Sequence, residues 1–167
     1  ALCPLLNAED RAAWVRVLGR FVDLHLRTAR EQFWTTTCIP NANPVCNGGG
    51  GLAALALLDE HPQAHESLRL ARSFLPFFAD WCQNPDGSNT EGAQYWQYGL
   101  TSCLVFAWSL ERALGTDDAL LGRPQFRQAW NMIAGCLTND GAMHGVNDTI
   151  PMAMGRDIAA TAALRHG

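Results

Sequence analysis

A turn runs directly into a long apolar helix in the stretch Asn84-Pro85-Asp86-Gly87-Ser88-Asn89-Thr90-Glu91-Gly92-Ala93-Gln94-Tyr95-Trp96-Gln97-Tyr98-Gly99. The Asn-Pro and Asp-Gly pairs are typical of turns, and Thr90 is a favourable N-cap residue for the helix that follows. The start of that helix carries a carboxylate, amides, a tryptophan and both tyrosines of the chain. Core packing does not require this combination, so we expect functional chemistry here.

Helical periodicity extends from this stretch in both directions. The helix expected over Glu91–Leu114 carries an apolar seam and ends at Gly115; the seam consists of Trp96, Leu100, Cys103, Ala107, Leu110 and Leu114. A first helix is expected from an Asn7 N-cap, with an inward face of Trp14, Val17, Leu18, Phe21, Leu24 and Thr28. Further helices are expected over Leu52–Leu58 behind four glycines, from Pro62 with a kink at Pro76, from about Pro124 and from Pro151.

The polar segments between these helices predict irregular structure. Thr35–Asn47 contains two prolines and three asparagines, which disfavour a helix, and Thr138–Asp148 is also rich in turn residues. We find no strand pattern. Buried and amphipathic helices alternate, which predicts an all-α protein built as a partial (α/α) toroid of helical hairpins. Residues 1–167 are expected to form one helical domain, with the polar loops gathered at one end.

Composition excludes several classes of protein. The net charge is -4 and no basic stripe is present, so we expect no nucleic-acid partner. The most apolar run, Leu52–Leu58, is too short for a membrane span. No CxxC pair occurs, so neither a metal site nor any cofactor is expected. Cys38 and Cys46 could be bridged or free, and the other helical cysteines are expected to be small buried residues. Ala1 begins no signal-peptide pattern, so such a peptide is expected to be absent or already removed.

Three segments resemble the heparinase II/III-type polysaccharide lyases in order and spacing, across roughly Trp34 to Met154. They are Asn41-Ala42-Asn43-Pro44-Val45-Cys46-Asn47-Gly48-Gly49, the stretch from Asp86 to Gly99 with its Glu-Gly-x-x-Tyr-Trp-x-Tyr-Gly string, and Gly145-Val146-Asn147-Asp148-Thr149. The resemblance implies an (α/α) toroid in which later hairpins and a C-terminal β-sandwich are missing from this chain. It also implies that the rest of the same polypeptide or a second chain completes the fold, and a periplasmic or secreted location.

The chemistry implied by the resemblance is β-elimination at a uronic acid within an acidic polysaccharide. A base removes the proton beside the carboxylate, which must be neutralised by hydrogen bonds, and the 4-linked oxygen leaves. The resemblance implies Tyr95 as the catalytic tyrosine, with Tyr98 second, and Asn43 as the neutralising residue, supported by Asn41. Because a tyrosine ordinarily has a pKa of about 10, a base role needs nearby donors or positive charge. The substrate-binding residues are expected to be Glu91, Gln94, Trp96, Tyr98 and His144.

Three alternatives remain open at the level of sequence. The two tyrosines could simply cap a helical core with their hydroxyls in water. A glycoside hydrolase would need two carboxylates, and Glu91 could pair with Asp148 or Asp86. A non-catalytic scaffold could bind sugar by stacking on Trp96 and Trp34. A lyase product contains an ultraviolet-absorbing double bond, a hydrolase product only a new reducing end.

Overall fold

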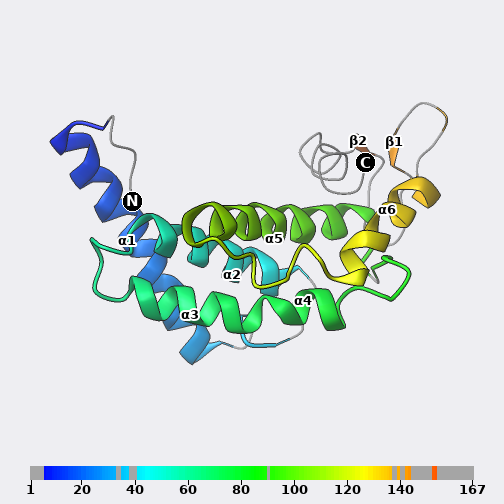
Figure 1. Ribbon diagram of the computed structural model, residues 1–167, viewed down its shortest axis with the longest axis horizontal. Coiled ribbons are helices and arrows are strands. Elements are labelled where there is room, and N and C mark those ends of the chain that lie inside the picture. The colour runs from blue at the N-terminus through cyan, green and yellow to red at the C-terminus, as the bar shows by residue number, and fades with distance from the viewer. Residues whose placement is uncertain are drawn as a thin grey trace.

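The computed structural model describes residues 6–32, 35–37, 41–89, 91–136, 139, 142–143 and 152–153. Within these ranges the chain is mainly helical, which confirms the all-α prediction (Figure 1). The helices are α1 (Ala8–Glu31), α2 (Ala42–Ala56), α3 (Ala64–Phe74), α4 (Pro76–Trp81), α5 (Ala93–Leu114) and α6 (Pro124–Cys136). Two short strands, β1 (Ala142–Met143) and β2 (Met152–Ala153), pair antiparallel.

The centre of the molecule is a parallel pair of helices, α2 and α5, which lie side by side in Figure 1. The contacts between them follow the same sequence order along both helices. Pro44 contacts Gly99, Gly48 contacts the Ser102 carbonyl, and Gly51 contacts the Phe106 ring. Both helices therefore begin at one end of the molecule and finish at the other. α3 packs against α2 on one side, and α1 contacts both α2 and α3.

The seam of α5 forms much of the core, as predicted. Trp96, Leu100, Cys103, Ala107 and Leu110 are buried, whereas Leu114 at the end of the helix is exposed. The helix starts after Gly92, whose φ is 90°, and ends at Gly115, whose φ is 73°. Such left-handed values favour glycine. The predicted start is therefore wrong by two residues, because the N-cap is Gly92 rather than Thr90.

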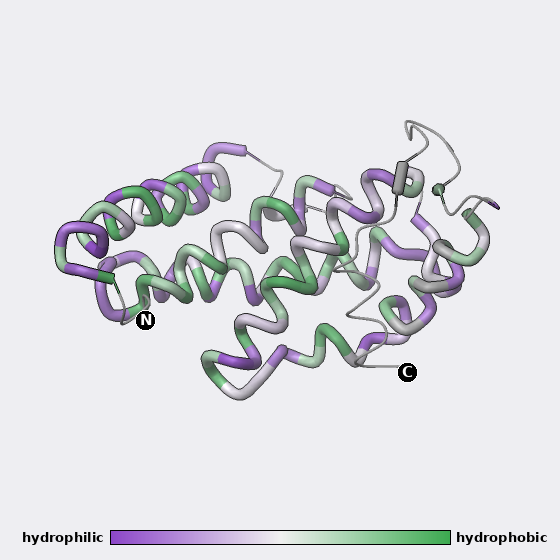
Figure 2. Tube along the Cα trace, turned by 90° about the horizontal axis from the view of Figure 1, so that it is seen from above, coloured by the Kyte–Doolittle hydropathy of each residue, from purple (hydrophilic) through white to green (hydrophobic). Residues whose placement is uncertain are grey.

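The inward face predicted for α1 is wrong. Asn7 does cap the helix, accepting a hydrogen bond from the Asp10 backbone N–H. However, the residues that α1 buries are Gly19, Val22, His25 and Leu26. Four of the residues expected to face inward are exposed instead, and we call them the α1 stripe: Trp14, Val17, Phe21 and Leu24. Figure 2 shows hydrophobic and hydrophilic residues interleaved along the helices, and in α1 only part of the hydrophobic residues reach the core.

The start predicted for the second helix is also wrong, because α2 begins at Ala42 rather than at Leu52. Pro44 lies in the first turn, where a missing N–H disrupts no helical hydrogen bond. Asn47 continues the helix because its side-chain amide donates to the carbonyls of Thr35 and Asn43. Gly48–Gly51 consequently lie within α2, where they allow close helix packing.

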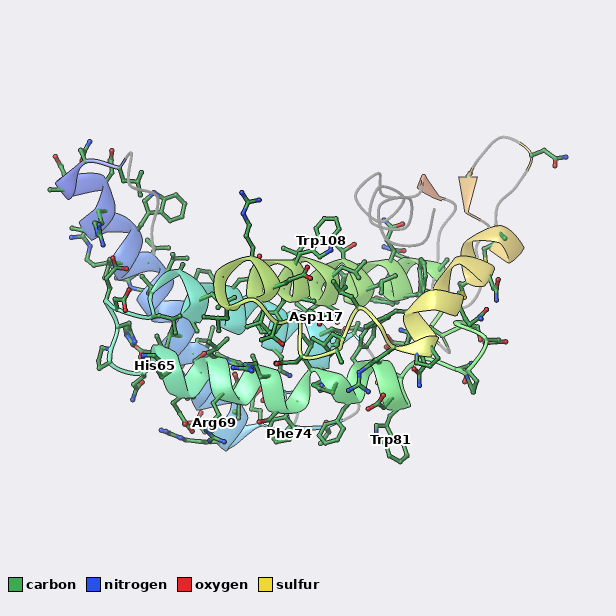
Figure 3. All side chains as sticks on the ribbon, in the orientation of Figure 1. His65, Arg69, Phe74, Trp81, Trp108 and Asp117 are labelled. Carbon is green, nitrogen blue, oxygen red and sulfur yellow. The ribbon has the colours of Figure 1, made fainter. Side chains whose placement is uncertain are left out.

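The helical segment around Pro76 is divided as expected: α3 ends at Phe74, and α4 begins at Pro76. The start is later than predicted, at Ala64 rather than Pro62. Trp81 is 72% exposed and points away from the body of the molecule (Figure 3). Near the other end of the chain, the helix expected from Pro151 is contradicted by β2 at Met152–Ala153.

The cysteines with described surroundings act as the sequence suggests. Cys82 and Cys103 are buried in the core, and Cys46 is a free thiol. Burial raises the pKa of the Cys46 and Cys103 thiols, since it penalises the thiolate. No helix in the described part of the chain has the length and apolar character needed to cross a membrane.

Candidate functional site

A hydrogen bond joins the two segments that the sequence singles out. The Asn41 side-chain amide donates to Glu91 Oε1 over 2.8 Å, across fifty positions of sequence. Asn41 is the N-cap residue of α2, and Glu91 directly precedes Gly92, the N-cap of α5. Because α2 and α5 are parallel, their N-terminal ends lie together. The two polar loops that precede α2 and α5 therefore lie at one end of the molecule, as the sequence predicts for them.

The turn before α5 is fixed by side-chain hydrogen bonds. Asn89 is buried; its amide nitrogen donates to the Cys82 carbonyl over 3.1 Å, and its oxygen accepts from the Glu91 backbone N–H over 2.7 Å. Asp86 Oδ1 accepts from the backbone N–H and the hydroxyl of Ser88. These hydrogen bonds hold the pKa of Asp86 below its ordinary value. The turn thus holds Glu91 in position and gives Asp86 a local structural role.

Gly87 shows why this turn contains an Asp-Gly pair. Its φ is +84°, and a Cβ at this position would overlap the Gln128 carbonyl in α6 at 2.0 Å. The turn can therefore approach the α6 backbone only with glycine at this position. The side chain of Asn131 also reaches back to the Asp86 carbonyl at 3.4 Å.

Two tyrosines are exposed near the start of α5. Tyr95 is 37% exposed and Tyr98 is 54% exposed, whereas Gln94 is partly buried and makes contacts of its own. The first backbone N–H groups of α2 do not donate to the side chain of its N-cap Asn41, and the N-cap of α5, Gly92, has no side chain to accept from them. This end of the molecule therefore combines accessible phenols with two adjacent helix N-termini.

Asn43, expected to neutralise the substrate carboxylate, is buried and bonded to backbone carbonyls instead. It is 0% exposed, and its amide nitrogen donates to the carbonyls of Thr37 and Phe74, each over 3.1 Å. Both N–H bonds of the amide are thereby used. Asn43 connects α2 to the end of α3 and has no free donor for a substrate carboxylate.

Trp96 cannot stack on a sugar, because its side chain is 0% exposed within the core. That corrects the expectation that it contacts substrate. Its indole Nε1 has no hydrogen-bond partner among the described residues, and the same holds for Asn43 Oδ1 and Glu91 Oε2. Buried polar atoms usually have a partner. Three of the residues singled out from the sequence thus each carry a buried polar atom without a hydrogen-bond partner in the described part of the chain.

Sequence reasoning missed a buried polar network centred on His25. The Nδ1 atom lies 2.8 Å from Ser67 Oγ, and Nε2 lies 3.1 Å from Asn47 Oδ1. Because the Asn47 amide nitrogen donates to two carbonyls, its oxygen accepts from His25 Nε2–H. The Ser67 hydroxyl faces Nδ1 and also lies 3.4 Å from the Gly50 carbonyl. Ser67 is 0% exposed, so its hydroxyl serves this internal network. The three residues come from three helices, and no sequence spacing connects them.

Several expected residues lie outside the described part of the chain, namely Trp34, His144 and Asp148. Within the described part, no cluster of three or more histidine, cysteine or acidic residues could hold a metal ion. Comparison with known proteins does not assign the site: no family model matches the chain, and no curated protein or solved structure is significantly similar to it.

Proposed function

We propose that this chain is part of a polysaccharide lyase that cleaves a uronic-acid-containing acidic polysaccharide by β-elimination. One observation carries the proposal: the Asn41–Glu91 hydrogen bond unites the two motif segments at the common N-terminal end of α2 and α5. The same end holds the exposed tyrosines. The substrate is an acidic glycan, and the location we propose is periplasmic or secreted.

The roles follow from what β-elimination requires. Removing the proton beside a carboxylate requires that the carboxylate be neutralised. It also requires a base that takes the proton and an acid that protonates the leaving oxygen. In our proposal, Tyr95 exchanges protons with the substrate and Tyr98 binds it. The amide of Asn41 and the backbone N–H groups at the two helix N-termini hold the uronate carboxylate, since helix N-termini favour anions.

Asn43 and Trp96 enter this proposal as positioning residues. The two hydrogen bonds of Asn43 fix the start of α2 relative to Thr37 and Phe74, and buried Trp96 anchors the first turns of α5. Glu91 orients Asn41 by accepting its hydrogen bond. A glycoside hydrolase receives less support, because Asp86 is committed to Ser88 and Glu91 to Asn41.

We also propose that the helices are part of an (α/α) toroid forming one domain over residues 1–167. The support is a parallel pair of inner helices, α2 and α5, connected by an outer segment, α3 and α4 (Figure 1). The α1 stripe would then face a neighbouring helix supplied by the same polypeptide or by a second chain. Such a neighbour would remove four large apolar side chains from water.

The test is incubation of the protein with heparin and with alginate, followed by ultraviolet absorbance and by a reducing-end assay. We expect both signals to rise together, and Tyr95→Phe to lower the rate at least about 100-fold, the usual scale of acid–base catalysis. The melting temperature should stay unchanged, because the Tyr95 side chain is partly in water.

Tyr98→Phe is the matched control, since it removes the same hydroxyl one turn away. Near-normal activity in Tyr95→Phe with loss in Tyr98→Phe would transfer the role to Tyr98. Reducing ends without ultraviolet absorbance would indicate a hydrolase and overturn the lyase proposal. Binding without either signal would indicate a non-catalytic scaffold.

A further inference from the structure

We propose that the α1 stripe binds a second copy of this chain, and that it packs there on helix α2. The inference is independent of the proposed lyase activity. The four residues of the α1 stripe are each between 42% and 55% exposed, and they follow one another along one helix. Single exposed apolar residues are ordinary, whereas a contiguous row of large ones marks an interaction surface.

Helix α2 has an uncovered side of its own, which we call the α2 seat. A Cβ at Gly48 would meet α5, one at Gly50 would meet α1, and one at Gly51 would meet α5 and α3. At Gly49 it would meet nothing within 4 Å. Since successive residues of a helix turn by about 100°, Gly49 points between α1 and α5 and away from α3. The residues of α2 that are not buried lie on this side and form the seat: Ala42, Val45, Cys46, Gly49, Leu52 and Ala56.

The α1 stripe adjoins the α2 seat on the same side of the molecule. Gly19 of α1 lies against His61, in the link that leads into α3. Phe21, two residues further along, points about 200° away from Gly19, so the stripe also faces away from α3. His25 lies one turn after Phe21 and is hydrogen-bonded to Asn47 of α2. The stripe and the seat are therefore neighbours on one face.

The two surfaces complement each other in size and in length. The α1 stripe is made of large side chains, and its stretch from Trp14 to Leu24 is about 15 Å long at 1.5 Å per residue. The α2 seat is made mostly of small residues, and on the same scale it is about 21 Å long. A two-fold axis that runs between α1 and α2 would place each stripe on the seat of the other copy. Both contacts then form together, which closes the assembly as a dimer.

Charge favours this pairing over a direct contact between two copies of α1. The charged groups beside the stripe have both signs and are exposed: Arg16, Arg20, Asp23 and Arg27. Because α2 contains no charged residue, these groups meet none of like sign over the seat and stay in water. An antiparallel contact between two α1 helices would instead bring the two Arg20 side chains together, because Arg20 lies at the middle of the stripe.

The area available is enough for a reversible dimer. An aromatic side chain has roughly 150–250 Å² to bury, so the exposed parts of Trp14 and Phe21 offer on the order of 100 Å² each. With Val17, Leu24 and the seat included, and with both symmetric contacts counted, the interface reaches on the order of 1,000 Å², the lower end of the range for specific interfaces. A dimer of this size dissociates on dilution, so at low concentration the stripe of each monomer lies in water.

The test is sedimentation equilibrium of the whole chain over a series of concentrations. We expect the mass to rise from that of one chain toward that of two. Phe21→Asp should raise the dissociation constant of the dimer about tenfold or more, because it places a carboxylate in the contact, and Gly49→Leu should do the same by filling the seat. Both variants should keep their fold, since Phe21 is exposed and a Cβ at Gly49 is unobstructed, which circular dichroism checks.

An equimolar mixture of the two variants tests the reciprocal arrangement. The stripe of Gly49→Leu and the seat of Phe21→Asp are both intact, so the mixture should associate more tightly than either variant alone. Val105→Asp is the matched control, since it introduces the same charge at a 43% exposed position of α5 that lies outside the contact. It should leave the dissociation constant unchanged.

The mass of one chain at every concentration would overturn the proposal. So would normal dimerisation of Gly49→Leu, or a mixture that associates no better than its components. Equal weakening by Val105→Asp and Phe21→Asp would indicate a general charge effect and would also overturn it.

Discussion

Adjacent glycines of α2 differ sharply in what surrounds them. A Cβ at Gly50 would lie 2.3 Å from the His25 ring, and a Cβ at Gly51 would lie 2.3 Å from the Phe106 ring. At Gly49 a Cβ would meet nothing within 4 Å. The run of glycines in the sequence therefore serves helix packing at some positions and leaves another open to water.

Gly50→Ala and Gly49→Ala should change stability in opposite directions. We expect Gly50→Ala to lower the free energy of unfolding by about 1–3 kcal/mol, because His25 must move. Gly49→Ala should raise it by about 0.5–1 kcal/mol, since alanine favours the helix and nothing blocks its methyl group. Urea denaturation of both variants measures this. Equal effects would show that α2 is not packed as described.

The same contrast exists between the two sides of helix α1. Val22 is 0% exposed, whereas Phe21 next to it is 55% exposed. Hydrophobic periodicity did not identify the correct side, because apolar residues cover both. The side that packs contains Gly19, which lies against His61 in the link between α2 and α3, and His25, which contacts Asn47 of α2 and Ser67 of α3. Periodicity does not include these partners.

Val22→Ala and Phe21→Ala test which side of α1 is buried. Val22→Ala should destabilise the protein by about 1–2.5 kcal/mol, because it removes methyl groups from a packed core. Phe21→Ala should change stability by less than about 0.5 kcal/mol, as expected for a surface position. Thermal unfolding of the two variants provides the comparison. A larger loss in Phe21→Ala would mean that another surface covers the α1 stripe in solution.

The elements predicted well from sequence are those with clear local boundaries. α5 has a single seam and is bounded by glycines at both ends, so its position and core residues followed from the pattern. α2 was misplaced because its first turns contain Pro44 and Asn47, which disfavour a helix on average. Here the proline lies where its missing N–H is harmless, and the Asn47 amide is satisfied by carbonyls. One of these two hydrogen bonds goes to the Thr35 carbonyl, which lies outside the helix, so local helix propensity could not predict it.

At the scale of the whole molecule, the His25 network ties α1, α2 and α3 together. Burial lowers the pKa of His25, partly offset by its hydrogen bond to Asn47. Above the unfolded pKa of about 6.5, both folded and unfolded chains hold the neutral ring, so stability does not change through this group. Below it, the unfolded chain binds more protons than the folded one. The free energy of unfolding should therefore fall as pH decreases, and level off below the lowered pKa.

Chemical denaturation between about pH 7.5 and 5 measures this slope, above the range in which carboxylates titrate. His25→Gln should flatten the slope even if it lowers stability overall. His65→Gln, at an exposed position, should preserve the slope. A slope that survives His25→Gln would assign the pH dependence to another group.

The candidate site was only partly accessible to sequence reasoning. The turn chemistry and the cluster of polar residues before α5 were visible in the pattern, and the alternation of buried and amphipathic helices predicted that the polar loops lie together. The burial of Asn43 and Trp96 was not visible, because it depends on carbonyls at Thr37 and Phe74 and on a core assembled from several helices.

The parallel alignment of α2 and α5 also shapes how a charged molecule would approach the protein. Each helix contributes roughly half a positive charge at its start, but the Glu91 carboxylate accepts the Asn41 hydrogen bond at the same place and offsets this charge. On a chain whose net charge is -4, an anion would therefore have to be held at these two starts by hydrogen bonds, which act only at contact. Since dissolved ions screen charges beyond about 10 Å at 0.1 M salt, a higher ionic strength would reduce the repulsion from the rest of the surface and favour such an encounter.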